Sequence, residues 1–122
     1  MIATAKVHAT TDARFAFDVL RSPIPVLVEF FAAWCPSCAA LEPVLDELAD
    51  DWEGHLAVVK IDVDRHRATA ERYGIMSVPT LVLFDAGEER QRLVNVVRRK
   101  RIEAELEGWA PSVVKPRTRA WP

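Results

Sequence analysis

The sequence has few cysteines. Only two occur in 122 residues, Cys35 and Cys38, separated by two residues. A small secreted domain held together by disulfides would carry more cysteines, spread along the chain, so that class is excluded. A Cys-x-x-Cys pair in a chain that otherwise lacks cysteine is typical of a redox-active pair or of part of a metal site. Two buried core cysteines are the purely structural alternative.

Long hydrophobic runs and a strong net charge are also missing. The apolar stretches are far shorter than the roughly 18 residues that a membrane span needs. The net charge of −2 gives no indication of a nucleic-acid or membrane partner. The first residues show no basic stretch followed by an apolar run, so we expect no signal peptide and a cytoplasmic location. The length suits one domain, which we expect to be a monomer.

The hydrophobic pattern predicts an α/β domain. Val26–Phe31 is apolar on both faces except at Glu29, as in a central strand covered on both sides. The element order predicts a central mixed sheet of about five strands flanked by about four helices, with a late antiparallel hairpin. The domain is expected over 1–110, with a flexible Pro-rich and basic tail over 111–122. Strands are predicted over 6–9, 26–31, 56–61, 80–84 and 91–96, and helices over 10–20, 35–51, 65–73 and 99–109.

Cys35 is placed where a strand ends and a helix begins. A helix N-terminus carries partial positive charge and free N–H groups, which stabilise a thiolate and lower the pKa of Cys35. Pro36 suits the first helical position because its missing N–H is not needed there. Cys38 follows one turn later and is expected to be the more buried thiol. We therefore predict that Cys35 attacks a substrate disulfide and Cys38 resolves the mixed disulfide.

A zinc site is the chemical alternative for this pair. Zinc needs about four ligands, and the further nitrogen ligands on offer are His8, His55 and His66. None of the three stands in register with the cysteines, so redox chemistry is favoured and no metal is expected. Asp62 and Asp64 are expected to cap the helix that begins near Arg65 rather than to bind a metal.

From about Val26 to Leu106, and more loosely from Lys6, the chain resembles the thioredoxin family. The Cys-x-x-Cys pair followed by a later Val-Pro-Thr segment is a specific combination. The resemblance implies a thioredoxin fold and a protein-disulfide reductase that serves electron transport and redox homeostasis. It also implies no bound cofactor, disulfide-containing clients, and electrons from NADPH only through a thioredoxin reductase. The matching residues are Phe30, Ala32, Trp34, Cys35, Cys38, Pro43, Ile61–Asp64, Tyr73–Ile75, Val78–Thr80, Phe84 and Gly87.

The resemblance assigns roles to further residues. Pro79 is expected to follow a cis peptide bond beside the cysteines. Glu29 and Lys60 stand where thioredoxins have a buried aspartate and a lysine, and protein disulfide isomerase-type domains likewise carry glutamate there. A buried carboxylate has a raised pKa, so Glu29 is expected to accept the proton of Cys38 through water while Lys60 partly compensates its charge. A structural buried ion pair of Glu29 and Lys60 is the alternative.

The resemblance also predicts a peptide-binding surface that is apolar with free backbone edges, suited to an extended peptide. Asn95 stands where the family usually has glycine, and it tolerates left-handed backbone but adds bulk. Pro36-Ser37 replaces the common Gly-Pro, and the Ser37 hydroxyl close to Cys35 predicts a less reducing protein than a typical thioredoxin. The predicted surface residues are Trp34, Met76, Ser77, Val78, Pro79 and Asn95.

The basic run Arg98-Arg99-Lys100-Arg101 resembles a nucleic-acid patch, but glutamates follow it at helical spacing. We expect Arg99–Glu103 and Arg101–Glu105 pairs on a solvated surface, with a docking site for an acidic partner as the alternative. Two other functions remain open from the sequence. Glu29 and the Pro36-Ser37 pair favour a disulfide oxidant or isomerase, whereas Asn95, the basic run and the tail favour a client-binding module with little turnover.

Overall fold

The computed structural model describes residues 7–107, and it has the predicted α/β architecture. The predicted tail over 111–122 and the predicted end of the last helix lie outside the described residues. No helix within 7–107 is long and apolar enough to cross a membrane. In chain order the elements are β1 (Val7–Ala9), the π-helix η1 (Ala16–Leu20), β2 (Val26–Phe31), α1 (Pro36–Asp51), β3 (Ala57–Asp62), α2 (Arg67–Arg72), β4 (Thr80–Asp85), β5 (Glu88–Val94) and α3 (Arg99–Glu107).

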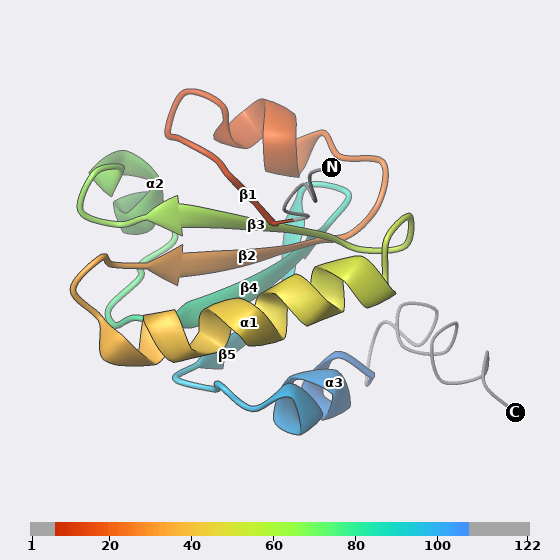
Figure 1. Cartoon of the computed structure of the whole chain (residues 1–122). Coiled ribbons are helices and arrows are strands. Elements are labelled where there is room, and N and C mark those ends of the chain that lie inside the picture. Colours follow the sequence, from red (N-terminus) through yellow and green to blue (C-terminus); the bar gives the residue numbers. More distant parts are fainter. Residues whose placement is uncertain (1–6, 108–122) are drawn as a thin grey trace, which may run out of the picture.

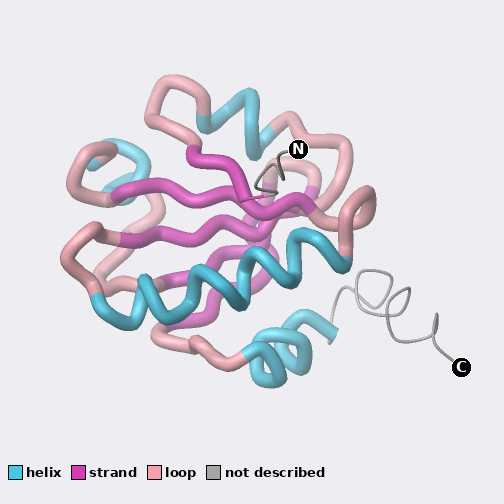
Figure 2. The backbone as a smooth tube through the Cα atoms, in the orientation of Figure 1, coloured by secondary structure: helices cyan, strands magenta, loops and turns pink. Residues whose placement is uncertain are grey.

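The strands form one mixed sheet in the order β1-β3-β2-β4-β5 (Figures 1 and 2). β1, β3 and β2 are parallel, whereas β4 runs antiparallel to both β2 and β5. The predicted central position of β2 and the predicted late hairpin are therefore confirmed. The register places Glu29 of β2 beside Lys60 of β3, which brings the two predicted charged residues onto neighbouring strands.

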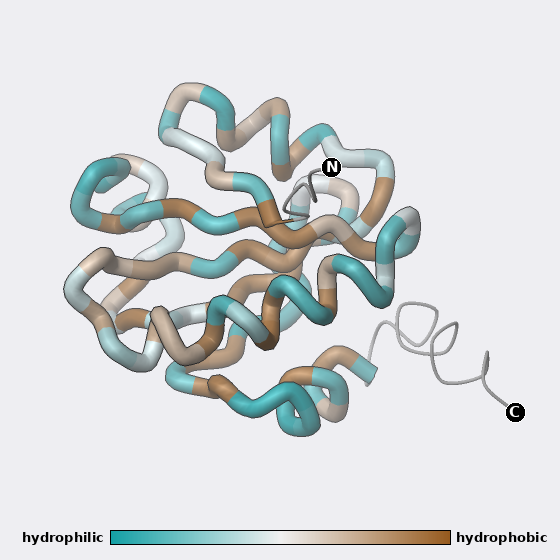
Figure 3. Tube along the Cα trace, in the orientation of Figure 1, coloured by the Kyte–Doolittle hydropathy of each residue, from teal (hydrophilic) through white to brown (hydrophobic). Residues whose placement is uncertain are grey.

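Each face of the sheet is covered by a different set of helices. Because side chains alternate along a strand, Leu27 packs with α1 and α3, while Val26 and Val28 pack with η1 and the segment after α2. Brown, hydrophobic stretches accordingly run along the central strands, and α1 alternates between brown and teal (Figure 3). Glu29 is two residues beyond Leu27, so its side chain belongs to the face that α1 covers.

Several predicted boundaries differ from the structure, most of all those of the first helix and of β5, which ends at Val94 rather than at residue 96. The first helix is only the short η1, because the Thr11 hydroxyl accepts the N–H of Arg14 at 3.1 Å and the preceding residues form a turn. β5 begins at Glu88 rather than at residue 91, since Ala86 and Gly87 alone make the hairpin turn. Their φ values of 53° and 82° are the left-handed pair that a tight hairpin requires.

The predicted capping of α2 by Asp62 and Asp64 is wrong. α2 begins at Arg67, and Asp62 instead closes the turn before it by accepting the N–H groups of Asp64 and Arg65. The cap comes from across the fold: Asp12 Oδ1 accepts the backbone N–H of Thr69 at 2.9 Å and its hydroxyl at 2.6 Å. These bonds hold the pKa of Asp12 below its ordinary value.

The two ion pairs predicted for the basic run are present on α3. Arg99 pairs with Glu103 at 2.8 Å, and Arg101 pairs with Glu105 at 3.0 Å. Arg99 also reaches Asp51 at the end of α1, at 2.7 Å. Arg99 therefore joins α3 to α1, which explains why a cation stands at a helix N-terminus, where the helix dipole disfavours it.

Candidate active site

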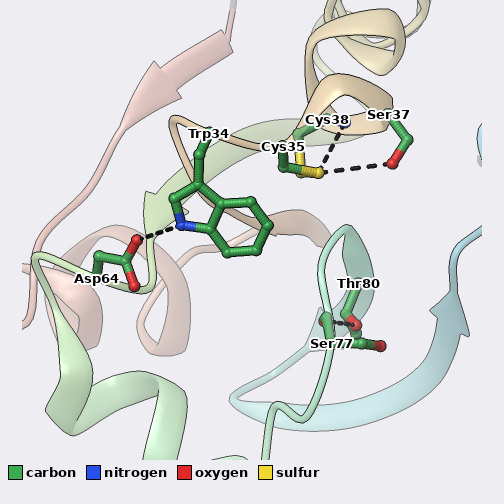
Figure 4. The surroundings of a disulfide bond; sticks show 7 residues. All are labelled: Trp34, Cys35, Ser37, Cys38, Asp64, Ser77 and Thr80. Atoms are coloured by element: carbon green, nitrogen blue, oxygen red, sulfur yellow. Dashed lines mark hydrogen bonds between the residues drawn. A yellow bond between two sulfur atoms is a disulfide. The ribbon is translucent and has the colours of Figure 1, made fainter.

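Cys35 and Cys38 are joined as a disulfide with a Cα–Cα distance of 5.2 Å (Figure 4). Cys35 has extended backbone angles and is the N-cap of α1, with Pro36 in the first turn. Its Sγ accepts the backbone N–H of Cys38 at 3.1 Å. The helix thus directs a free N–H and its positive end toward the sulfur of Cys35, as the sequence predicts.

The solvent exposure of the two cysteines does not show which one attacks and which one resolves. Cys35 is 5% exposed and Cys38 is 3% exposed, so the expected difference in burial is small. Both pack with Ala32, and Val78 lies against this cluster. The Ser37 hydroxyl lies 3.5 Å from the Cys35 sulfur, the proximity that the sequence predicts. Cys35 is distinguished by the donors aimed at it, not by its exposure.

A shallow groove lies beside the disulfide. Four of the six predicted recognition residues line it, namely Trp34, Met76, Ser77 and Val78, together with Val63 and Ile75. The Trp34 and Met76 side chains are exposed, 69% and 93% respectively. Such large exposed apolar groups beside a reactive centre are typical of a binding surface.

The loop that lines this groove leads into Pro79, whose peptide bond with Val78 is cis, as predicted. Thr80 donates its hydroxyl to the Ser77 carbonyl at 2.7 Å, which ties the loop to β4 (Figure 4). Asn95 has a φ of 57°, in the left-handed region, and its backbone N–H donates to the Pro79 carbonyl at 2.9 Å. Asn95 itself lines a different depression, with Arg98 and Arg101, rather than the Trp34 groove.

Asp64 belongs to the site, although its sequence context suggested only a helix cap. The Trp34 indole Nε1 donates to Asp64 Oδ2 at 2.8 Å (Figure 4). This bond holds the polar edge of an otherwise exposed ring. An aspartate that follows a strand has the same local signature whether it caps a turn or binds a distant side chain, so no sequence signal identified this contact.

A second, charged cavity lies between β2, β3 and α1. Glu29 reaches it from β2 and is only 1% exposed, and its Oε2 has no hydrogen-bond partner among the described residues. Burial raises the pKa of Glu29 to about 7, with Lys60 opposing the rise and Glu42 adding to it. The raised pKa agrees with the sequence prediction. The cavity is lined by Val7, Glu29, Glu42, Leu45, Asp46 and Lys60.

Lys60 lowers the pKa of Glu29, in the direction of the predicted partial compensation, but it forms no direct ion pair with that carboxylate among the described residues. Its Nζ lies 3.7 Å from Glu42 Oε2 and 5.4 Å from the centre of the Phe31 ring. Among the described residues, the ion pair that Lys60 forms is therefore with Glu42 and not with Glu29. Glu42 was missed from the sequence because it occupies an ordinary polar position of an amphipathic helix. Within residues 7–107, no three His, Cys, Asp or Glu side chains are grouped as metal ligands.

Comparison with known proteins places this geometry in a family. The Thioredoxin family model matches residues 6–108. A thioredoxin of Synechocystis is 42% identical over 107 residues, which cover 88% of this chain and 97% of that protein. A thioredoxin of Mycobacterium tuberculosis is 42% identical over 111 residues, covering 91% and 93%. The chloroplastic thioredoxin M4 of Arabidopsis thaliana is 40% identical over 105 residues, covering 86% of this chain and 54% of that protein.

A disulfide at a helix N-terminus, a cis-proline segment whose Val78 packs against it, and a buried acid on β2 agree with these similarities. The chain belongs to the thioredoxin family, and it is a thiol–disulfide oxidoreductase, a protein-disulfide reductase that works through Cys35 and Cys38.

Proposed function

We propose that Cys35 is the attacking thiol and Cys38 the resolving thiol in the reduction of client proteins. The Cys35 thiolate attacks one sulfur of a client disulfide, forms a mixed disulfide and expels one client thiolate. Cys38 loses its proton, and its thiolate attacks the Cys35 sulfur. This step restores the Cys35–Cys38 disulfide and releases the second client thiolate, so that two electrons pass to the client.

One observation carries this assignment: the Cys35 sulfur sits at the N-cap of α1 and accepts the Cys38 N–H at 3.1 Å. A hydrogen bond from N–H to sulfur strengthens when the sulfur becomes negative, because charge-assisted hydrogen bonds are the stronger kind. The positive end of the 16-residue helix acts in the same direction. Both contributions favour the thiolate of Cys35, the state that attacks.

Glu29 is assigned the role of proton acceptor for Cys38, through water. Its cavity has about 160 Å³ of space for water, far more than one molecule needs. With a pKa of about 7, Glu29 is partly ionised near neutral pH and can both accept and release a proton there. Lys60 tunes this acid by lowering its pKa.

The assignment is tested by the reduction of insulin disulfides with dithiothreitol. Cys35→Ser is expected to abolish turnover, because it removes the attacking thiol. Reduced Cys38→Ser, incubated with insulin after dithiothreitol has been removed, is expected to stop after the first step and to accumulate a mixed disulfide visible by intact mass spectrometry. Glu47→Gln, an exposed change on the same helix, is the control and should leave turnover unchanged. A Cys38→Ser protein that turns over like wild type would overturn the assignment, and catalysis by Cys35→Ser would do the same.

The client is proposed to bind as an extended peptide along the groove of Trp34, Met76, Ser77 and Val78, with Pro79 and Asn95 at its far side. The exposed apolar side chains of Trp34 and Met76 and the loop that lines the groove beside them suit such a ligand. We further propose a monomer that works in the cytoplasm, in electron transport, and is re-reduced by a thioredoxin reductase that draws on NADPH. A cysteine pair in an otherwise cysteine-free chain suits a reducing compartment.

A disulfide oxidant or isomerase is the second candidate, favoured by the Ser37 hydroxyl at 3.5 Å from the Cys35 sulfur, a donor that stabilises the reduced form. Equilibration of the Cys35–Cys38 pair in glutathione buffers separates the two. We expect a potential somewhat above the roughly −270 mV of thioredoxin but below the roughly −180 mV of isomerases. A potential between about −180 and −120 mV would replace the reductase with the oxidant.

A further inference from the structure

Exposure of the charged side chains increases stepwise across the cavity between β2, β3 and α1. Glu29 is 1% exposed, while the side chains of Lys60 and Glu42 are 30% and 54% exposed. One further charged residue among the described ones lines this cavity, namely Asp46, which like Glu42 belongs to α1. β1 contributes Val7 to the lining, and β4 places Leu81 beside Glu29 in the sheet. The cation of the cavity thus has acids on both its inner and its outer side.

The cation is shared unequally between these acids. Lys60 and Glu29 are register neighbours on adjacent strands, yet the Lys60 Nζ lies 3.7 Å from Glu42 Oε2 and 5.4 Å from the centre of the Phe31 ring. The Oε2 atom of Glu29 is meanwhile left without a hydrogen-bond partner among the described residues. A buried carboxylate without a partner is costly, whereas a half-exposed ion pair contributes little by itself.

We propose that Glu42 is a positioning residue for the buried acid: it holds the Lys60 ammonium at the cavity mouth and so leaves Glu29 without a full counter-ion. This proposal rests on the proposed role of Glu29 as proton acceptor. Glu42 acts in two ways, by its own negative charge and by withdrawing the positive charge of Lys60. Both disfavour the carboxylate form of Glu29, and both therefore act with burial to keep its pKa above the ordinary value.

The direct test is the titration of Glu29 in the oxidised protein, where the cysteines do not ionise. Carbon-13 NMR of labelled glutamate side chains follows the Glu29 carboxyl, and Glu29→Gln identifies its resonance. In Glu42→Gln the midpoint should fall by about one pH unit from its wild-type value, the lower end of the effect that a nearby charge has. Glu47→Gln removes the same charge from the same helix, where the partner is Arg99 instead of Lys60, and it should leave the midpoint unchanged. A Glu42→Gln midpoint equal to wild type would overturn the proposal.

A second comparison tests whether Glu42 acts through Lys60. Lys60→Gln alone should raise the Glu29 midpoint, because Lys60 is the one cation among the described residues that line the cavity. In that background Glu42→Gln should lower the midpoint by less than it does with Lys60 present, since only its direct charge remains. Equal shifts in the two backgrounds would overturn the positioning of Lys60 by Glu42.

Kinetics separate this inference from the proposed function. The rate of mixed-disulfide resolution should show an acid limb that moves to lower pH in Glu42→Gln, by the same amount as the NMR midpoint. If the midpoint moves and the acid limb does not, the control of Glu29 by Glu42 stands and the role of Glu29 as proton acceptor fails. If neither moves while Glu29→Gln slows resolution, Glu29 remains the acceptor and the role of Glu42 fails.

Discussion

The structure has two hollows of opposite chemical character, an apolar groove and a charged cavity. The groove, beside the redox pair, is lined by Trp34, Val63 and the loop 75–78, and its largest side chains are exposed. The cavity, between β2, β3 and α1, is lined mainly by charged residues, and its central acid is almost fully buried. Apolar groups at the surface can gain free energy only by binding something, whereas a buried acid is sensitive to charge and water.

The two hollows suit different parts of the reaction. Exposed apolar contact area suits the groove for holding a client. Perturbed ionisation suits the cavity for moving a proton. Changes in the groove should therefore alter client affinity, and changes in the cavity should alter rate and pH dependence. Each experiment below would break or sharpen this division.

The largest effect is expected from Glu29→Gln, which keeps the shape of the side chain but removes the base. Resolution of a mixed disulfide should slow on the order of 100-fold, as loss of a general base commonly does. Rapid-quench trapping of the mixed disulfide measures this step, and the first attack by Cys35 should be unchanged. An unchanged resolution rate would remove Glu29 from the mechanism.

The same residue should cost stability in a pH-dependent way. Its pKa is 4.5 ordinarily and about 7 in the folded protein. A folded-state pKa above the unfolded value contributes stability that is complete below about pH 4.5 and is lost as pH rises to about 7. The loss amounts to about 3 kcal/mol, since each pKa unit corresponds to about 1.4 kcal/mol.

Urea unfolding of the oxidised protein between pH 4.5 and 8 measures this loss, with Glu29→Gln as the reference that cannot ionise. Wild type should fall relative to the variant up to about pH 7 and then run parallel to it, because Glu29 is ionised in both states above that pH. Curves that stay parallel over the whole range would show that Glu29 titrates normally in the folded protein.

A smaller effect is expected in the groove. Trp34→Ala should raise the KM for a protein disulfide and lower kcat/KM about 10-fold, because truncating a central aromatic contact commonly costs more than 1 kcal/mol. Phe17→Ala is the matched control, since Phe17 is also an exposed aromatic, 62% against 69%, but does not line the groove. A fall in kcat without a change in KM would place Trp34 on the chemical side of the division.

The smallest effect is expected from Asp64→Asn, which keeps an oxygen acceptor for the Trp34 indole but removes its charge. The hydrogen bond of 2.8 Å should weaken and kcat/KM should fall about two- to three-fold, the value of part of one hydrogen bond. In a Trp34→Ala background the same change should have no effect. An equal effect in both backgrounds would show that Asp64 acts independently of Trp34.

The local sequence pattern predicted the bounds of an element well where its run of apolar residues is continuous. It predicted them poorly where a side-chain contact or a turn conformation decides where a helix or strand begins. β2 has the predicted bounds because its apolar run is continuous. α2 begins later than predicted because its cap, Asp12, lies far away in the sequence and is brought there by the fold. The turn before β5 is shorter than predicted because Ala86 adopts the left-handed region, which its identity does not announce.

The sequence by itself determined the fold class, the redox pair and its place at a helix N-terminus, and the buried position of Glu29. These follow from periodicity along the chain, from short-range spacing and from the family resemblance. The tertiary structure alone decided which acid binds Lys60, which residue holds the Trp34 ring and which residue caps α2. The physical reason is that Glu42, Asp64 and Asp12 each act on a partner distant in the chain, and their local contexts are those of ordinary surface residues.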